Sequence, residues 1–383
     1  MKIVIAPDSF KDSLTALEVA RLIEAGLRHS FPHARYELIP MADGGEGTVA
    51  ALVAARGGRL VRARVMGPLG TPVLARYGRL PDGSAVVEMA AASGLERVPE
   101  GLRNPLRTTS FGAGQLVRHA LAAGAGQVLL GIGGSATVDG GLGFAQALGA
   151  RFLDDRGRPL PAPLAGADLR RVAGLDFTQV DPRAGPALRV ACDVQSPLAG
   201  PRGAAAVFGP QKGATPAQVR RLDAGLMRLG RLLERHCGQR VVNTPGAGAA
   251  GGLGAMLLGA LGCRLERGVE LVLEFADVAA RFRGASLVIT GEGCLDAQTG
   301  LGKVPQGVLL LARQMNIPVV ALAGAIVSDA NVNKTSAAAY AISAVSQPQS
   351  LAEALRGARS SVRYAALRLG NILLAGQALT RDS

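Results

Sequence analysis

Short, fully apolar segments recur near both ends of this chain of 383 residues, and they limit its fold more than any other feature. Residues 3–6 read as a buried strand that is followed by a loop and a helix. Residues 287–290 and 318–323 repeat the buried-strand pattern. Such strands alternate with helices in parallel sheets that are covered on both faces. The sequence therefore predicts an α/β protein with a doubly wound sheet.

Helix starts fit the same reading. Thr15 precedes an amphipathic segment and has Glu18 three residues later, which is the pattern of a capping box. The pattern returns at Thr215 with Gln218, before a helix that should end at Gly238. Between the two ends, strands are expected at 85–89, 127–132 and 188–193. We therefore expect one α/β domain made from residues 1–65 and 285–383, with a second α/β domain inserted at 66–284 and the active site in the cleft between them.

Composition narrows the classes of function. The formal net charge is +13, but the basic residues are spread singly, and aromatic residues make up only 3% with no Trp. This favours a solvated surface that attracts small anions over a nucleic-acid-binding face. The four cysteines lack metal-binding spacing, and residues 241–263 contain Asn243 and Pro245 within a glycine-rich stretch that is not typical of a membrane span. We expect a cytoplasmic protein that binds neither nucleic acid nor membrane.

Glycines and carboxylates cluster at several points, and three of these clusters directly follow expected strands. Backbone N–H groups of glycine-rich turns can approach phosphate oxygens closely at that edge of an α/β sheet. Plain turn formation is the alternative for any single cluster. The clusters are 43–47, 131–141, 246–254 and 291–296.

Several common catalytic patterns are missing. The sequence has no P-loop and no G-x-S-x-G motif, and the G-x-G-x-x-G match at 246–251 lacks the preceding strand of a dinucleotide site. The four histidines lie outside the glycine clusters, so any general base should be a carboxylate. Only five lysines stand against 37 arginines. Lys11, Lys212 and Lys303 lie in or beside loops, where a compact ammonium group can neutralise phosphate.

Eight further segments match one known pattern: 5–11, 42–48, 104–105 with 108–110, 133–137 with 139–141, 191–194, 206–214, 245–254, and 289–293 with 295–296. On these segments the sequence resembles the type I glycerate kinase family from residue 1 to about residue 325. It departs from the family pattern in small ways: Asp12 stands where the family usually has Gly, Cys294 stands where it usually has Arg, and residues 298–303 are close to the usual pattern but not identical.

The resemblance implies ATP-dependent phosphorylation of D-glycerate with Mg²⁺, in a two-domain fold with a flavodoxin-like part. It favours the 2-hydroxyl group and thus 2-phosphoglycerate as product, with the 3-hydroxyl as the alternative. A homodimer is the candidate assembly. Two rivals from other classes are an NAD-dependent oxidoreductase and a basic nucleic-acid-binding protein.

Phosphoryl transfer needs positioning, charge neutralisation and a carboxylate near the attacking hydroxyl. We expect Asp193 as the base, with Lys11 and Lys303 as catalytic cations. The remaining expected groups are listed by role: phosphate or nucleotide binding by Ser9, Gly133, Gly134, Ser135, Gly291, Gly293 and Lys212; substrate binding by Asp8, Asp43, Gly44, Gly45 and Asp296; metal binding by Asp139, Glu46 and Glu292.

Overall fold

The computed structural model describes residues 1–295, 303–327 and 340–381, and the chain divides into two compact units. The first is built from both ends of the chain, whereas the second is formed by its middle. Unit 1 comprises Met1–Asp43, Ala50–Gly57 and Val269–Ser383, and unit 2 comprises Gly44–Val49 and Gly58–Gly268.

Unit 1 contains a parallel sheet with the order β13-β12-β11-β1-β2, counted over the described residues. Read from the other edge, this is the order 2-1-3-4-5 of flavodoxin-like folds. The strands are β1 (Lys2–Ile5), β2 (Arg35–Leu38), β11 (Leu287–Leu295), β12 (Val319–Ile326) and β13 (Ala341–Ser343). The helices are α1 (Ala16–Leu27), α2 (Thr48–Arg56), α10 (Gly268–Phe275), α11 (Val278–Phe282), α12 (Val304–Gln314) and α13 (Leu351–Arg381).

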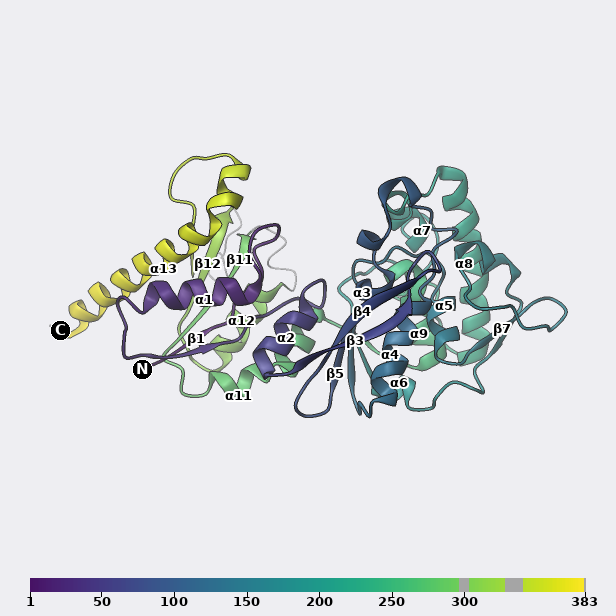
Figure 1. Ribbon diagram of the computed structural model, residues 1–383, viewed down its shortest axis with the longest axis horizontal. Coiled ribbons are helices and arrows are strands. Elements are labelled where there is room, and N and C mark those ends of the chain that lie inside the picture. Colours follow the sequence, from purple (N-terminus) through teal and green to yellow (C-terminus); the bar gives the residue numbers. More distant parts are fainter. Residues whose placement is uncertain (296–302, 328–339, 382–383) are drawn as a thin grey trace. The chain divides into compact units, whose positions relative to one another are not determined.

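Helices α1 and α13 lie side by side on one face of this sheet, although they come from opposite ends of the chain (Figure 1). The approach is close: a Cβ atom on Gly26 of α1 would lie 2.4 Å from the carbonyl oxygen of Arg363 in α13. The buried side chains of Ile23 and Val362 contribute to the core between the helices and the sheet. Thr15 accepts the N–H of Glu18, which confirms the predicted capping box at the start of α1.

Unit 2 contains a mixed sheet, which has the order β10-β9-β6-β5-β4-β3 in the described part of the chain. The first four strands are parallel, and the last two are antiparallel. The strands are β3 (Arg59–Met66), β4 (Pro72–Arg79), β5 (Ala85–Glu88), β6 (Val128–Gly131), β9 (Leu188–Ala191) and β10 (Leu265–Glu266), with β7 (Arg151–Leu153) and β8 (Gly174–Asp176) as a separate pair. The helices are α3 (Ala90–Ser93), α4 (Phe111–Ala122), α5 (Leu142–Ala147), α6 (Ala184–Ala187), α7 (Ala204–Phe208), α8 (Pro216–Cys237) and α9 (Ala249–Leu261).

The two sheets confirm the predicted α/β class. The boundaries of the units differ from the expected domain boundaries for two physical reasons. Strand β3 belongs to unit 2 because it pairs with β4 along its whole length, from Arg59 to Met66. Helices α10 and α11 lie in unit 1, where the guanidinium group of Arg281 binds Glu37 and the carbonyl of Leu38 on β2.

One predicted loop is a strand. We expected Gly291 and Gly293 to lie in a turn after a strand that ends at Thr290, but β11 continues to Leu295. The glycines permit this, because a Cβ atom on Gly291 would lie 2.0 Å from the carbonyl oxygen of Leu322 in the neighbouring β12. At this position glycine allows β11 and β12 to pack closely.

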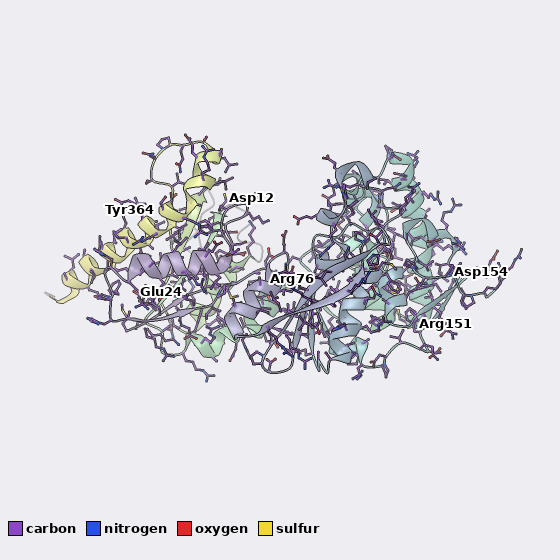
Figure 2. The ribbon with its side chains drawn as sticks, viewed as in Figure 1. Asp12, Glu24, Arg76, Arg151, Asp154 and Tyr364 are labelled. Atoms are coloured by element: carbon purple, nitrogen blue, oxygen red, sulfur yellow. The ribbon has the colours of Figure 1, made fainter. Side chains whose placement is uncertain are left out.

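The arginines of unit 2 are distributed over many elements, and β3, β4 and α8 each carry more than one. Arg76 on β4 and Arg151 on β7 are two examples (Figure 2). Arg151 forms an ion pair with Asp176 of β8. The positive charge is thus spread over the surface and partly paired. Among the helices of the described residues, none is long and apolar enough to cross a membrane.

Candidate functional site

The pairing of β1 with β11 brings Asp8, in the loop after β1, close to Glu292, which lies within β11. The two strands are parallel neighbours, and the backbone N–H of Asp8 donates to the carbonyl oxygen of Gly291 at 2.8 Å. Strand order reverses between β1 and β11, because the chain proceeds from β1 to β2 on one side and from β11 to β12 on the other. Ligands of open α/β sheets bind at such points.

The environment of Asp8 disfavours its charged form. Burial raises the pKa of this carboxyl group from 3.8 to about 7, and the negative charges of Asp43 and Glu292 add to the effect. The backbone N–H of Ser9 donates to Asp8 Oδ1 at 2.6 Å and offsets part of the increase. Asp8 can therefore exchange a proton near neutral pH, as a general base must.

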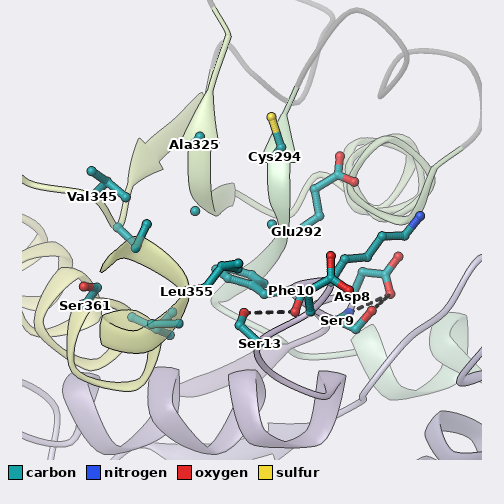
Figure 3. A pocket seen from close by; sticks show the side chains of 18 of the residues that line it. Asp8, Ser9, Phe10, Ser13, Glu292, Cys294, Ala325, Val345, Leu355 and Ser361 are labelled. Atoms are coloured by element: carbon teal, nitrogen blue, oxygen red, sulfur yellow. Dashed lines mark hydrogen bonds between the residues drawn. The ribbon is translucent and has the colours of Figure 1, made fainter. Parts of the chain in front are cut away.

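These carboxylates line a pocket of about 310 Å³ that lies within unit 1 (Figure 3). Two cations share its polar end. Lys11 lines the pocket, and the ammonium group of Lys303, which caps α12, lies 3.6 Å from Glu292 Oε2. The expected site residues that line it are Asp8, Ser9, Lys11, Asp43, Glu292, Gly293 and Lys303.

Other expected residues of unit 1 lie elsewhere. Gly291 is buried inside β11, which does not favour its predicted contact with phosphate. Asp296, an expected substrate-binding residue, lies outside the described residues. Asp12 lines the pocket with φ of +61°, a left-handed conformation that favours glycine and that Asp tolerates better than most residues. Cys294 lines it as well, on β11.

In unit 2, the glycine loop after β6 has the exposed backbone that we expected of a phosphate site. Gly133 and Gly134 are exposed, and Gly134 has φ of +68°. Ser135 next to them is buried, and its hydroxyl oxygen accepts a hydrogen bond from Lys212.

Lys212 is only 3% exposed, so its predicted direct contact with phosphate is not favoured. Its ammonium group donates to Ser135 and to the carbonyl oxygen of Thr137. Burial lowers its pKa to about 7, although the charge of Asp139 acts in the opposite direction. The lysine supports the glycine loop from inside the unit.

The structure also does not favour the predicted metal role of Asp139. Its carboxylate is fully buried and accepts hydrogen bonds from Ser110 Oγ and from the backbone N–H groups of Ser110, Gly141 and Gly143. These donors occupy both oxygens. Through these hydrogen bonds Asp139 connects the start of α4 to the turn before α5, as a structural residue does.

Gly44 and Gly45 pack against the same glycine loop. A Cβ atom on Gly131 would lie 2.4 Å from the carbonyl oxygen of Gly44, and one on Gly133 would lie 3.6 Å from the Cα of Gly45. Here glycine allows two backbones to meet. Asp193 follows β9 in the same sheet, is exposed, and accepts the N–H of Gly268 at 3.1 Å.

Sequence reasoning missed Glu88, the last residue of β5. Its carboxylate accepts the backbone N–H of Val49 at 2.6 Å, near the start of α2. Burial raises its pKa to about 7, with a contribution from the charge of Glu46. Glu88 thus connects the 44–49 segment to the sheet edge that carries the glycine loop. In the sequence, Glu88 could have been recognised as a site candidate because it directly follows three apolar strand residues.

Comparison with known proteins gives one consistent result. The model of the glycerate kinase family matches residues 3–374. A protein named glycerate kinase from Haemophilus influenzae is 50% identical over 334 residues, which cover 87% of this chain and 88% of the relative. A protein named glycerate 2-kinase from Escherichia coli K12 is 45% identical over 378 residues, which cover 98% of this chain and 99% of the relative. A crystal structure of a proposed glycerate kinase 2 from Salmonella typhimurium LT2 is similar with a TM-score of 0.89 and 48% identity, and the match covers 99% of each chain.

Proposed function

The chain belongs to the glycerate kinase family, and we propose that it transfers the γ-phosphate of ATP to D-glycerate. The single observation that carries this proposal is the family match, which spans nearly the whole chain. For the position of transfer we propose the 2-hydroxyl group, giving 2-phosphoglycerate, because a relative named glycerate 2-kinase aligns over 98% of this chain. We also assign the chain to the type I class. The homodimer and the cytoplasmic location stay predictions.

We propose Asp8 as the group that accepts the proton of the attacking hydroxyl. A base works best when its pKa is near the working pH and when it faces the substrate. Asp8 meets both conditions, since it lines the pocket and its pKa is raised to about 7. Asp193, the base expected from the sequence, remains the alternative.

Charge on the transferred phosphate must be neutralised. In unit 1 this task falls to Lys11 and Lys303 at the polar end of the pocket. In unit 2 the backbone N–H groups of Gly133 and Gly134 are suited to an anion, and Ser135 and its partner Lys212 hold that loop in place.

The carboxylates fit Mg²⁺ as the ion that accompanies ATP. Mg²⁺ usually takes one or two carboxylates, and waters and phosphate oxygens complete its shell. Within the part of the chain that the structure describes, no group of three or more His, Cys, Asp or Glu side chains is placed to hold a metal. Asp43 and Glu292, whose charges act on Asp8, would hold the ion, and Glu46 is the further candidate in unit 2. When bound, Mg²⁺ neutralises part of the phosphate charge.

The test is to incubate the protein with ATP, Mg²⁺ and D-glycerate and to identify the product by phosphorus NMR. We expect ADP release that requires D-glycerate and stops on addition of EDTA. A product that enolase consumes directly supports transfer to the 2-hydroxyl, whereas one that first needs phosphoglycerate mutase indicates the 3-hydroxyl. ADP release that is unchanged by D-glycerate would contradict the proposed function.

A further inference from the structure

The pocket of unit 1 has two chemically different ends. Asp8, Glu292 and the two lysines form the polar end, whereas α13 and the residues that follow β13 supply apolar side chains at the other (Figure 3). We call the second end the apolar arm: Val345, Leu351, Ala354, Leu355, Ala358 and Val362.

D-Glycerate alone does not account for this arm. It is a three-carbon acid with two hydroxyl groups and a carboxylate, so nearly all of its surface is polar. Binding it beside Leu355 and Val362 would remove polar groups from water without hydrogen bonds to replace them, which is costly. A volume of about 310 Å³ lies in the range of sites that enclose larger organic ligands. The arm is built for a second, less polar chemical group.

We propose that the apolar arm binds the adenine base of ATP and that the triphosphate extends to the polar end of the pocket. This inference rests on the proposed function, because ATP is the co-substrate there. A purine is flat and buries both faces against aliphatic side chains, while its nitrogen edge needs a few polar partners. The hydroxyl group of Ser361, which lines the arm, can donate one hydrogen bond and accept others.

The charges at the other end fit the remainder of the nucleotide. Lys11 follows β1, and Lys303 stands at the start of α12, an 11-residue helix whose N-terminal dipole favours phosphate. Asp43 and Glu292 would repel a bare triphosphate, but they attract one that carries Mg²⁺. The order along the pocket is therefore the base at α13, then the phosphates with their cation beside Asp8 and Glu292.

Two alanines of α13 provide a matched test. Ala354 is half-buried and lines the arm, whereas Ala352 is exposed and is not part of the pocket lining. Ala354→Phe should fill the arm. We expect it to raise the Kd for ADP, measured by calorimetry, and the KM for ATP by about tenfold or more, a change equivalent to roughly 1.4 kcal/mol. The KM for D-glycerate should stay within about twofold, and Ala352→Phe should leave all three constants unchanged.

The outcomes distinguish a failure of the assigned adenine site from a failure of the proposed function. An unchanged Kd for ADP in Ala354→Phe overturns the assignment of the arm, and so does a rise in the KM for D-glycerate alone. If the wild-type protein binds ADP but does not phosphorylate D-glycerate, the proposed function fails, and the ADP titration still decides the occupant of the arm.

Photolabelling covers the case in which Ala354→Phe lowers the melting temperature. Wild-type protein is irradiated with 8-azido-ADP and the labelled peptide is sequenced. Label on residues 344–362 supports the proposal. Label confined to unit 2 refutes it.

Discussion

The ammonium group of Lys212 lies 2.7 Å from the hydroxyl oxygen of Ser135 and 2.8 Å from the carbonyl oxygen of Thr137, in the interior of unit 2. These bonds join the turn at Pro210–Lys212 to the loop that follows β6. A buried lysine is costly unless its donors are satisfied. The arrangement therefore fixes the glycine loop, whose exposed N–H groups we assign to anion binding.

Replacing Lys212 by Met keeps the chain length but removes the donors. We expect the free energy of unfolding to fall by about 1–3 kcal/mol, because Ser135 and Thr137 lose a buried partner. We also expect kcat/KM to fall, because the glycine loop is no longer held in place. In a double-mutant cycle with Ser135→Ala, measured by urea unfolding, the two effects should not add. Additive effects would show that the contact carries no coupling energy.

The same lysine should make stability depend on pH. Its pKa is lowered to about 7 in the folded state, below its ordinary value of 10.5, so the unfolded chain binds more protons between these values. The stability of the wild type relative to Lys212→Met should therefore increase from pH 7 to pH 10. A difference that stays constant over this interval would mean that Lys212 keeps its proton in the folded protein.

Asp139→Asn tests whether this residue is structural or binds metal. The amide places an N–H₂ group among N–H and O–H donors, so we expect a loss of about 2–4 kcal/mol in the free energy of unfolding. The Mg²⁺ concentration that gives half-maximal activity should not move. If the variant has normal stability but needs much more Mg²⁺ for half-maximal activity, Asp139 binds the metal.

Much of the framework could be predicted because it depends on local signals. Capping boxes at Thr15 and Thr215 set the starts of α1 and α8, and both formed as expected. Apolar runs predicted the inner strands. Parallel strands end at one edge of a sheet, so residues that follow the apolar runs 3–6 and 287–290, such as Asp8 and Glu292, were expected to belong to one site.

Other features depend on packing between distant segments, which no local pattern records. Asp139 and Lys212 have the charge of ligands, but the tertiary fold buries them. Glu88 ends an ordinary apolar strand. It becomes part of the sheet edge that carries the glycine loop only because β5 pairs with β6 and because the backbone N–H of Val49 donates to its carboxylate. β11 runs through its glycine cluster, and at Gly291 the neighbouring β12 lies too close for a side chain.

Glu88→Gln should change the pH dependence of stability in the opposite direction to Lys212→Met. The pKa of Glu88 is raised from 4.5 to about 7, so its stabilising contribution is fully present below pH 4.5 and is lost as the pH rises through 7. The stability of the wild type relative to the variant should fall by roughly 3 kcal/mol over that interval. The exposed Glu96→Gln serves as control and should give a flat difference.

Asp8→Asn should alter the pH–rate profile. Because the base must be deprotonated, wild-type kcat/KM should rise about tenfold per pH unit below its pKa of about 7 and level off above it. In Asp8→Asn the activity should be low and this rise should disappear, whereas Asp193→Asn should keep it. If instead the rise persists in Asp8→Asn and disappears in Asp193→Asn, Asp193 is the base.

Lys11→Arg should be far more damaging than the similarity of the two side chains suggests. The chain uses Arg for 37 of its 42 basic residues, yet it keeps Lys in the loop after β1. Lys11 is exposed and lines the polar end of the pocket, while its neighbour Phe10 is buried and anchors the loop. A compact ammonium can approach one phosphate oxygen where a planar guanidinium must rotate or displace the loop. An error of about 1 Å in placing such a group can lower the rate about a hundredfold.

The measurement is kcat/KM beside the melting temperature. The melting temperature of Lys11→Arg should match that of the wild type, since an exposed side chain in a loop contributes little to the core. Lys2→Arg is the control for activity, because Lys2 lies on β1 outside the pocket, where it pairs with Glu37, and its replacement should leave the activity normal. Normal activity in Lys11→Arg would mean that the lysine is incidental to phosphoryl transfer. A large drop in its melting temperature would mean that the role of Lys11 is structural.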